Sequence, residues 1–599
     1  MKSSKTKQPA PSGRASGRGV SAAVAAAPQP RRSPYLWPAL AVIAAAVFAV
    51  FIVYGPALNG PFMLDDDYLP YRLPAFMNAP LTHWIGKTRP FLFFSFWINL
   101  HTSGTSTYGY HVTNVLLHCL NGAWIYLALR KILTWAGTVQ WTREAAALFG
   151  AGLFLMHPLQ TESVSYIASR SELLSVCFFL AALVLFLYRK PAQSIWATAG
   201  VLVLYGAACL SKEHTVILPA LLLLTDYYWS PADPAKEPSL SMRGIRRNWR
   251  LYAILFALAA VGLFLLWTVV LGNASTAGFH VQGITWSEYF FTECRVIWTY
   301  LLLFVFPFHL NLDADVPIST GILSHGALFG LLGLVALSAA AWIYRRRFPA
   351  ASYGWFVFLL LIAPTSSFVP IADPYAERRL YMPFIGLTLI VVDFLRRWKI
   401  SRGALVAACG AILVFEGALA YQRNLLWADP VAMWKDTAEE SPQKVRPAWQ
   451  YALSLTEAGR CADASKEYAR AASLRPPEYG LIIDWALAAD CAGDGNQALQ
   501  RFQQAAAMQP SAHAFSQVGM EYAKQGKWAE AMDALNRSLQ FDPKYVKSYI
   551  YRGGVYESQG DFANAANEYR RALSIDPGNQ EAQQALARVE PRLASPAAR

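Results

Sequence analysis

The chain has few charged residues. Only 15% of its 599 residues are Asp, Glu, Lys or Arg, whereas 55% are hydrophobic. Soluble globular chains carry about a quarter charged residues, so this sequence cannot cover a water-facing surface over its whole length. The composition therefore excludes a row of about four soluble domains, which a length of about 150 residues per domain would suggest.

Acidic residues are absent from the first 34 positions, whereas several of the chain's Lys and Arg residues lie there. More than half of the net charge of +13 therefore belongs to one tail, residues 1–35, which is rich in Pro, Ser, Gly and Ala. A segment this polar does not fold by itself. We interpret it as a disordered, basic, cytoplasmic tail, and we expect no nucleic-acid partner.

The seven cysteines include no Cys-x-x-Cys pair. Zinc sites and thioredoxin-type redox sites use such close pairs, so neither is indicated. The chain has instead long apolar runs, which begin near Trp37, recur to Tyr421 and then stop. We predict eleven membrane spans, near residues 37–54, 111–129, 145–157, 172–188, 195–211, 214–229, 251–271, 322–344, 353–371, 379–395 and 403–421.

Lys and Arg residues in short loops predict the orientation, because cytoplasmic loops retain them. The tail is basic, and so are the loops at residues 130–143, 189–190, 243–250, 345–347 and 396–402. All of these lie inside if eleven segments span. The predicted exterior then comprises residues 59–110, 157–171, 272–321, 370–378 and everything after 422.

A further apolar stretch, residues 288–308, would break this alternation if it also crossed. It contains Glu288, Glu293 and Arg295, and charged groups are costly inside a bilayer. We therefore predict an interfacial or re-entrant segment that faces the outer side.

A repeat marks the soluble part of the chain. Prolines recur there at intervals of 33 or 34 residues, at Pro476, Pro510, Pro543 and Pro577, and glycines between them at Gly459, Gly493, Gly526 and Gly560. This is the tetratricopeptide period, with glycine where two helices turn tightly. We predict about four repeats within residues 443–599, closed by a capping helix at residues 580–592. Such an array binds an extended peptide on its concave face, or it serves only as a spacer.

The repeat geometry also pairs two cysteines. Cys461 opens the second helix of the first repeat, and Cys491 closes the first helix of the second repeat. The start of one helix lies beside the end of the other, so a Cys461–Cys491 disulfide is predicted if this part lies outside the cytoplasm.

Three consecutive acids, Asp65, Asp66 and Asp67, open the first exterior loop. Like charges at the end of a span raise one another's pKa. The functional interpretation is that one acid is a general base and another is its electrostatic or metal-binding partner. Asp67 is the additional acid that a metal site would use. The alternative is a solvated helix cap.

Other polar groups fall on the same predicted side. Taken singly, each could be an interfacial anchor or an ion pair that orients helices. Together, acids with Lys and Arg able to bind a phosphate predict a site for a lipid-linked anionic substrate. The residues are His111, Asn114, His157, Glu162, Arg170, Lys212, Glu213, Arg378, Arg379 and Tyr381.

These residues carry a family resemblance. Phe62-Met-Leu-Asp65-Asp66 resembles the Phe-x-x-Asp-Asp/Glu motif of the GT-C membrane glycosyltransferases. A close resemblance to the transmembrane-and-tetratricopeptide-repeat protein O-mannosyltransferases lies in several further segments. They are residues 110–118 and 157–174, the sequences Ser211-Lys212-Glu213 and Ala376–Tyr381, and the repeats. The resemblance covers nearly the whole chain after residue 36 and implies an all-α protein: a GT-C helix bundle at residues 36–422, then a tetratricopeptide solenoid.

The resemblance implies an inverting transferase that moves a sugar from a polyprenyl- or dolichyl-phosphate carrier to Ser or Thr hydroxyls of exported proteins. Asp65 matches the first acid of the motif and would deprotonate the acceptor, with Asp66 second. The cations named above would stabilise the lipid phosphate that leaves. The repeats would bind the acceptor protein. No cofactor is expected, although three adjacent acids permit a divalent ion.

The third acid, Asp67, departs from the family's pattern and leaves the position of the base open by one residue. The Ala-, Arg- and Pro-rich tail is typical of a bacterial chain, which favours a polyprenyl carrier and leaves the sugar open. We therefore predict a bacterial inner-membrane protein with its N-terminus cytoplasmic and its repeats periplasmic. The competing hypotheses are a membrane-anchored repeat adaptor for envelope assembly and a transporter or flippase of lipid-linked sugars.

Overall fold

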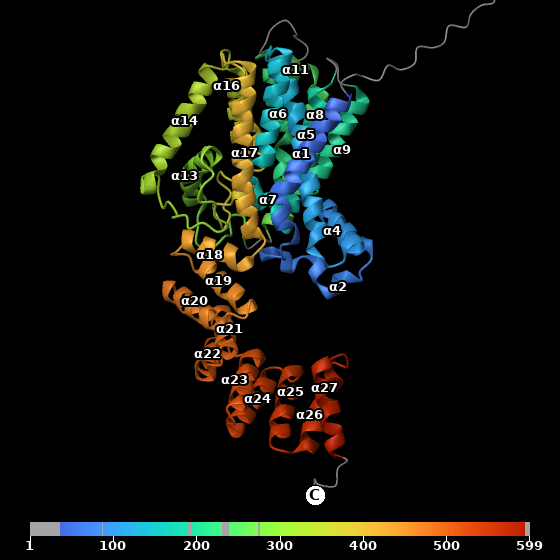
Figure 1. Cartoon of the computed structure of the whole chain (residues 1–599), viewed down its shortest axis with the longest axis vertical. Coiled ribbons are helices and arrows are strands. Elements are labelled where there is room, and N and C mark those ends of the chain that lie inside the picture. The colour runs from blue at the N-terminus through green and yellow to red at the C-terminus, as the bar shows by residue number, and fades with distance from the viewer. Residues whose placement is uncertain (1–35, 87, 190–193, 230–238, 273–275, 594–599) are drawn as a thin grey trace, which may run out of the picture. The chain divides into compact units, whose positions relative to one another are not determined.

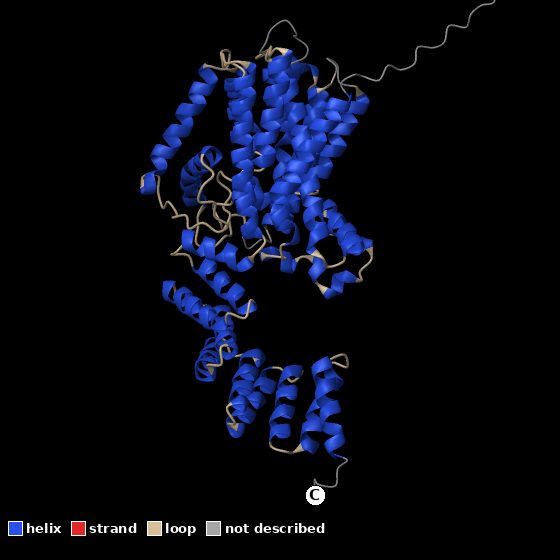
Figure 2. Ribbon diagram, in the orientation of Figure 1, coloured by secondary structure: helices blue, strands red, loops and turns tan. Residues whose placement is uncertain are grey.

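The structure, a computed structural model, describes residues 36–86, 88–189, 194–229, 239–272 and 276–593. Within these ranges all regular elements are helical (Figure 1, Figure 2), apart from one isolated bridge between Ala277 and Ile371. The predicted all-α class is therefore confirmed. The predicted disordered tail, residues 1–35, lies outside the described residues, as does Lys190 in one of the basic loops.

Among the described residues, six helices are long and apolar enough to cross a membrane, and each coincides with a predicted span. They lie in α1 (Leu36–Tyr54), α5 (Thr107–Trp135), α8 (Arg170–Leu187), α12 (Trp249–Leu265), α14 (Ala327–Ile343) and α17 (Arg402–Trp427). Shorter apolar helices correspond to three more spans: α9 (Ile195–Cys209), α15 (Pro349–Ile362) and α16 (Phe384–Leu395). The last two predicted spans fall on α6 (Gln140–Met156) and α10 (Leu218–Tyr228).

Helix α13 (Trp286–Val305) covers the stretch predicted to be interfacial. Near its start, the Tyr289 hydroxyl donates to the carbonyl oxygen of Thr365, just beyond the end of α15, at 2.6 Å. Near its end, the carbonyl oxygen of Phe304 lies 3.1 Å from Nε2 of His157, just beyond the end of α6. Because α6 and α15 both run toward the predicted outer side, these two contacts favour the prediction that α13 is an interfacial or re-entrant segment.

Short helices fill the connections. On the predicted outer side these are η1 (Gly55–Asn59), η2 (Leu64–Tyr68), η3 (Pro70–Arg72), α2 (Pro74–Met77), α3 (Leu81–Ile85), α4 (Pro90–Ser103), η4 (Pro158–Gln160), α7 (Thr161–Ser165), η5 (Ile167–Ser169) and η9 (Glu377–Leu380). Three more lie at the outer ends of predicted spans: η6 (Glu213–Ile217), η7 (Leu266–Leu271) and η8 (Ser324–Gly326). On the predicted inner side lies α11 (Arg243–Arg247).

Glycines allow α15 and α16 to pack closely. A Cβ atom added at Gly354 would lie 2.5 Å from the carbonyl oxygen of Gly386, and one at Gly386 would lie 2.5 Å from the backbone nitrogen of Phe358. Small residues are favoured at such contacts in a bilayer, where close backbone packing supplies much of the association energy. This contact fixes both ends of the segment 363–383, which carries Arg378.

The repeats are pairs of antiparallel helices (Figure 1). After α18 (Pro430–Glu440), the first and second helices alternate as α19 (Val445–Glu457), α20 (Cys461–Leu474), α21 (Tyr479–Cys491), α22 (Gly495–Met508), α23 (Ala512–Lys524), α24 (Trp528–Phe541), α25 (Val546–Ser558) and α26 (Phe562–Ile575), and α27 (Gln580–Leu593) caps the array. Each predicted turn glycine has a left-handed φ: 74° at Gly459, 81° at Gly493, 73° at Gly526 and 78° at Gly560. Only glycine adopts that conformation at little cost.

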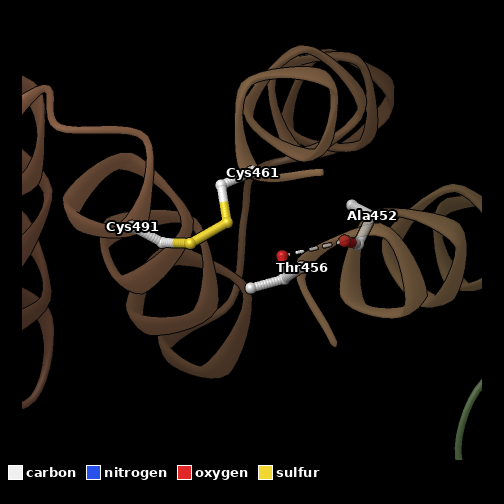
Figure 3. Close-up of a disulfide and its surroundings, with 4 residues drawn as sticks. All are labelled: Ala452, Thr456, Cys461 and Cys491. Carbon is white, nitrogen blue, oxygen red and sulfur yellow. Dashed lines mark hydrogen bonds between the residues drawn. A yellow bond between two sulfur atoms is a disulfide. The ribbon is translucent and has the colours of Figure 1, made fainter. Parts of the chain in front are cut away.

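The predicted disulfide is present between Cys461 and Cys491 (Figure 3). The two Cα atoms lie 5.8 Å apart, within the range that a disulfide spans without moving the backbone. The bond joins the start of α20 to the end of α21, so it ties the first repeat to the second.

Candidate functional site

Asp65 lies on a turn that directs its carboxylate into solvent. The residue is exposed, whereas its neighbour Asp66 is only 1% exposed. The preceding residue, Leu64, has a φ of 55°, in the left-handed region. A non-glycine residue adopts this conformation at a cost of about 1–2 kcal/mol, and such positions cluster at functional sites.

Two contacts with the segment 166–168 hold this turn. The backbone N–H of Asp65 donates to the Tyr166 hydroxyl at 3.0 Å, and the N–H of Ala168 donates to Oδ1 of Asp66 at 2.8 Å. The N–H of Met63 donates to Oδ2 of Asp66 at 3.1 Å. The backbone of Asp65 is therefore fixed on both sides while its carboxylate remains accessible.

Their surroundings shift the pKa values of Asp66 and Tyr166, the two side chains that contact the turn. Burial raises the pKa of the Asp66 carboxyl to about 7, although the N–H donors of Met63 and Ala168 act in the opposite direction. Burial, followed by the carboxylates of Asp65 and Asp66, raises the pKa of the Tyr166 hydroxyl well above its usual range, while Arg378 opposes this shift. Tyr166 is thus a neutral hydroxyl that accepts the backbone N–H of Asp65.

Arg378 is a partly exposed cation of η9. Its guanidinium pairs with Glu162, which also accepts the backbone N–H of Arg378 at 2.8 Å. Glu162 is 2% exposed at its side chain, whereas the Arg378 side chain is 34% exposed. The buried carboxylate therefore orients the guanidinium and leaves part of it exposed.

A second group of ion pairs lies at the start of η6. Nζ of Lys212 is 2.7 Å from Oε2 of Glu172, and Arg89 makes two hydrogen bonds of 2.8 Å to the carboxylate of Glu213. The side chains of Lys212 and Arg89 are 22% and 32% exposed. Lys212 and Glu213 thus keep partly exposed positions.

Arg170 departs from the prediction of a direct substrate contact. It is fully buried. Its Nε donates to Oδ1 of Asn114 at 2.8 Å, and its Nη atoms donate to Oδ1 of Asn99 and to the carbonyl oxygens of Ser95 and Tyr110. A guanidinium with all of these bonds cannot reach a phosphate, so Arg170 and Asn114 hold α4, α5 and the start of α8 together.

Three more predicted contact residues are also buried. Nε2 of His111 lies 3.2 Å from the carbonyl oxygen of Gly60. His157, just after α6, is bonded to the carbonyl oxygen of Phe304 in α13. The Tyr381 hydroxyl lies 2.9 Å from Nδ1 of His118 and accepts the side-chain N–H of Asn121. Each of the three is buried and bonded within the helix bundle, so these side chains position the site rather than line it.

Arg379 points away from Arg378. Its guanidinium donates to the carbonyl oxygens of Asp373, Pro374 and Thr365 and lies 3.6 Å from Glu293. The side chain is 9% exposed. Of the two adjacent arginines, Arg379 therefore shapes the loop, and Arg378 faces the site.

Sequence reasoning missed Arg89 and Tyr166. Arg89 had a usable signal, because Lys and Arg are depleted from exterior loops and this arginine lies in a loop predicted to be exterior. Tyr166 lies inside the segment 157–174 that carries the resemblance, but nothing in its spacing indicates that its hydroxyl accepts the N–H of Asp65. That contact joins residues 101 positions apart.

The described residues contain no group of three or more His, Cys, Asp or Glu side chains arranged to hold a metal ion. Asp67, the additional acid of a metal hypothesis, has its backbone in η2, but its side chain lies outside what the structure describes.

Comparisons with known proteins bear on both parts of the chain. Family models described as "TPR repeat" and "Tetratricopeptide repeat" match residues 519–560 and 546–589. The chain is 23% identical over 403 residues to Protein O-mannosyl-transferase F38B6.6 of Caenorhabditis elegans, covering 65% of this chain and 54% of that relative. It is 24% identical over 557 residues to Protein O-mannosyl-transferase Tmtc3 of Drosophila melanogaster, covering 78% of this chain and 58% of the relative. The chain resembles the protein O-mannosyl-transferases.

The match to these relatives is partial in length. Protein O-mannosyl-transferase TMTC1 of Homo sapiens is 24% identical over 517 residues, which cover 75% of this chain and 57% of the human protein. The chain thus spans just over half the length of the curated relatives it matches. Among solved structures, the crystal structure of MamA matches 24% of this chain and 81% of its own, with 19% identity and a TM-score of 0.23.

Proposed function

We propose that this chain is a membrane glycosyltransferase that moves a sugar from a polyprenyl-phosphate carrier to Ser or Thr hydroxyls of exported proteins. The observation that carries the proposal is the turn at Asp65, where an exposed carboxylate stands on a backbone fixed at both neighbours. The partly exposed Arg378, held by Glu162, supplies the cation. The similarity to protein O-mannosyl-transferases supports the reaction class.

In this mechanism Asp65 is the general base. Its exposed carboxylate accepts the proton of the acceptor hydroxyl as the oxygen attacks the anomeric carbon from the face opposite the leaving phosphate, which inverts the configuration. Asp66 is less suited to this role, because both of its oxygens already accept hydrogen bonds from the backbone. It fixes the turn, and Asp65 exchanges the proton.

The leaving phosphate gains negative charge as the glycosidic bond breaks. Arg378, with Lys212 and Arg89, would stabilise that charge, since fixed cations in a partly dry site need no reorganisation during the reaction. All three are paired with buried or half-buried carboxylates, which hold the cations in position before the donor arrives. The proposed mechanism uses no cofactor, and transfer that persists in excess EDTA would support this.

We place the chain in a bacterial inner membrane, with the N-terminus cytoplasmic and the repeats periplasmic, where they would bind the acceptor. The apolar helices and the basic connections support this orientation. The adaptor hypothesis requires one span and no solvated acid on a fixed turn, so the observed turn favours an enzyme. A flippase would place its charged groups near the membrane midplane and between two related halves.

Replacing Asp65 with Asn tests the proposal. The substitution keeps the size of the side chain and removes the base, so we expect transfer to a Ser-containing acceptor to fall by about 100-fold or more. The control is Asp533→Asn on the exposed surface of α24, which should leave transfer unchanged. Full transfer by the Asp65→Asn protein, at wild-type abundance in the membrane, would refute the role of Asp65; unchanged envelope glycosylation in a deletion strain would refute the function.

A further inference from the structure

An apolar crevice lies between α10 and α15. It has a volume of about 590 Å³, and its walls include Leu223 and Leu224 of α10 and Phe356 and Leu360 of α15. None of the side chains that line it is charged. Both helices fall on predicted spans, so the crevice lies at a depth where the bilayer holds hydrocarbon rather than water. A hydrocarbon chain is therefore the kind of ligand that suits it.

The short helix α11 lies at one end of this crevice. The backbone N–H of Ser241, just before α11, donates to the carbonyl oxygen of Tyr227 near the end of α10, at 3.1 Å. This bond brings Met242 and Ile245 to the crevice, which they line together with Tyr227. Because α10 ends on the predicted inner side, α11 marks the inner end of the crevice.

Two arginines of α11 follow the residues that line the crevice. Arg246 and Arg247 are exposed, and neither side chain makes a hydrogen bond or an ion pair with the residues that the structure describes. The backbone N–H of Arg246 donates to the carbonyl oxygen of Met242 at 2.9 Å, which is one helical turn. Residues four apart share one face of a helix, so Arg246 lies on the same face as Met242. That face joins an apolar crevice wall to an unpaired cation.

Another cation stands at the same end of the crevice. Trp342, near the end of α14, stacks on Tyr227 with ring centroids 6.2 Å apart, and its edge-on contact with Phe356 measures 6.3 Å between centroids. The guanidinium carbon of Arg345 lies 4.1 Å from the centroid of the Trp342 ring. Nε of Arg345 is buried and donates to no acceptor among the described residues. This guanidinium therefore has a donor to spare for a ligand.

The buried acid at the end of α10 does not neutralise these cations. Asp226 is paired with Arg189 and accepts the hydroxyl of Tyr252 at 2.7 Å. An anion from outside the chain can therefore use the donors of Arg246 and Arg345. Basic groups between spans on the cytoplasmic side are the means by which membrane proteins bind anionic lipid headgroups.

We propose that the crevice binds an anionic phospholipid of the cytoplasmic leaflet, with one acyl chain between α10 and α15 and its phosphate on Arg246 and Arg345. Arginine is well suited to this role, because its fork of donors matches a phosphate. The polyprenyl-phosphate carrier is excluded as the occupant because its phosphate must reach Asp65 on the predicted outer side, whereas these cations lie at the inner end. The inference goes beyond the proposed function and rests only on the proposed placement of the chain in the membrane.

The test uses the full-length protein in a non-ionic detergent and measures lipid binding by native mass spectrometry. Dioleoyl-phosphatidylglycerol is compared with dioleoyl-phosphatidylcholine, which has the same acyl chains and no net charge. We expect the phosphatidylglycerol to bind at least about tenfold more tightly. Each cation contributes about fivefold to the binding of an anionic lipid. Arg246→Gln and Arg345→Gln should therefore each weaken its binding about fivefold and leave phosphatidylcholine unaffected.

A second pair of substitutions tests where the acyl chain lies. Ala220, on α10, lines the crevice near its outer end, so Ala220→Phe fills space without removing a cation and should weaken phosphatidylglycerol binding severalfold. Ala407→Phe is the matched control, since Ala407 is an exposed alanine of α17. Arg402→Gln, at the exposed start of the same helix, is the control for the loss of charge. Neither control should change binding.

Should a variant fail to fold, the wild-type protein decides the matter. A phosphatidylglycerol with a photoactivatable diazirine in one acyl chain should crosslink to α10 and α15. Equal affinity for the two phospholipids, unchanged binding by Arg246→Gln and Arg345→Gln, or crosslinks confined to other helices would overturn the inference. Displacement of the crosslinking lipid by an equal amount of polyprenyl phosphate would also overturn it, because the crevice would then belong to the carrier.

Discussion

Asp66 stabilises the turn that presents Asp65, but at the expense of burying a carboxylate. It accepts N–H groups from both sides, from Met63 within the loop and from Ala168 in η5, while only 1% of its surface is exposed. Hydrogen bonds favour the charged form and burial disfavours it, and burial has the larger effect on its pKa. The strained Leu64 beside it persists because these contacts fix the backbone around it.

The pKa of Asp66 predicts a dependence of stability on pH. It rises from 3.8 to about 7 on folding, so between these values the native state binds more protons than the unfolded state. The free energy of unfolding therefore falls as pH rises from about 4 to about 7, by up to about 4 kcal/mol.

Thermal unfolding of the wild type and of Asp66→Asn, measured from pH 5 to pH 8, checks this. The Asn side chain does not titrate, so the stability of the wild type relative to the variant should fall across this range. A difference that stays constant from pH 5 to pH 8 would contradict the assignment of the shift to Asp66.

Individual residues also show where sequence reasoning stops. Charge, spacing and resemblance brought Asp65, Arg378 and Lys212 into one predicted site, and these side chains are open to solvent or partly so. The same reasoning included Arg170 and Tyr381, which are buried. A sequence pattern does not distinguish a cation that faces a ligand from one that holds helices together, because both uses select Arg in a polar segment at a membrane boundary.

At the scale of elements, the segment that carries Arg378 is bonded to the first repeat. Asp313, 4% exposed, accepts Nζ of Lys444 and Nε of Arg446, each at 2.5 Å. Arg446 also donates to Asp373, whose carbonyl oxygen accepts Arg379. Burial alone would raise the pKa of Asp313, but the two cations lower it below the usual range.

This contact predicts that Arg446→Ala loosens the connection between α18 and α19. Removing one cation takes hydrogen bonds from the buried carboxylate of Asp313 and leaves it with Lys444 alone, so we expect a loss of about 1–3 kcal/mol. Limited proteolysis should then cut near residues 441–446 faster, and transfer should fall severalfold. Arg537→Ala, which removes an exposed arginine on α24, is the control. Equal cleavage rates in the two variants would show that the contact does not hold the connection.

The disulfide acts at the same scale, between neighbouring repeats. It closes a loop with a sequence separation of 30 residues, and closing such a loop stabilises a fold by about 3–4 kcal/mol. The double variant Cys461→Ser/Cys491→Ser should therefore unfold its repeats at a clearly lower temperature. Cys409→Ser, which removes a free cysteine of α17, should not. Free thiols at Cys461 and Cys491 in the native protein, detected by alkylation and mass spectrometry, would contradict the pairing.

The elements themselves were largely predictable, for two different physical reasons. Apolar runs follow from the absence of water in a bilayer, and the repeat follows from a period that every unit must keep in order to stack. The turns at Gly459 and Gly493 and the Cys461–Cys491 bond depend on that period alone. The contacts of Asp313 with Lys444 and Arg446 were not predictable, since they join separately folded segments about 130 residues apart.

For the whole molecule, the side of the membrane on which each connection lies decides the function. The turn at Asp65, the Arg378 segment and the repeats must share one side for an acceptor on the repeats to reach the base. Contacts support this: Ala168 bonds Asp66, Glu162 pairs with Arg378, and Arg446 bonds Asp373. The arrangement depends on α13, because a crossing at that helix would reverse every later connection.

Cysteine labelling tests this orientation in the full-length protein. In a background without the five free cysteines, His280→Cys before α13 and His309→Cys after it should both react with a membrane-impermeant maleimide from outside, since both positions are exposed. Arg347→Cys, in a basic connection, should react only after the membrane is permeabilised. If His309→Cys also required permeabilisation, α13 would cross the membrane, and the repeats would lie on the side opposite Asp65, where they could not present an acceptor to it.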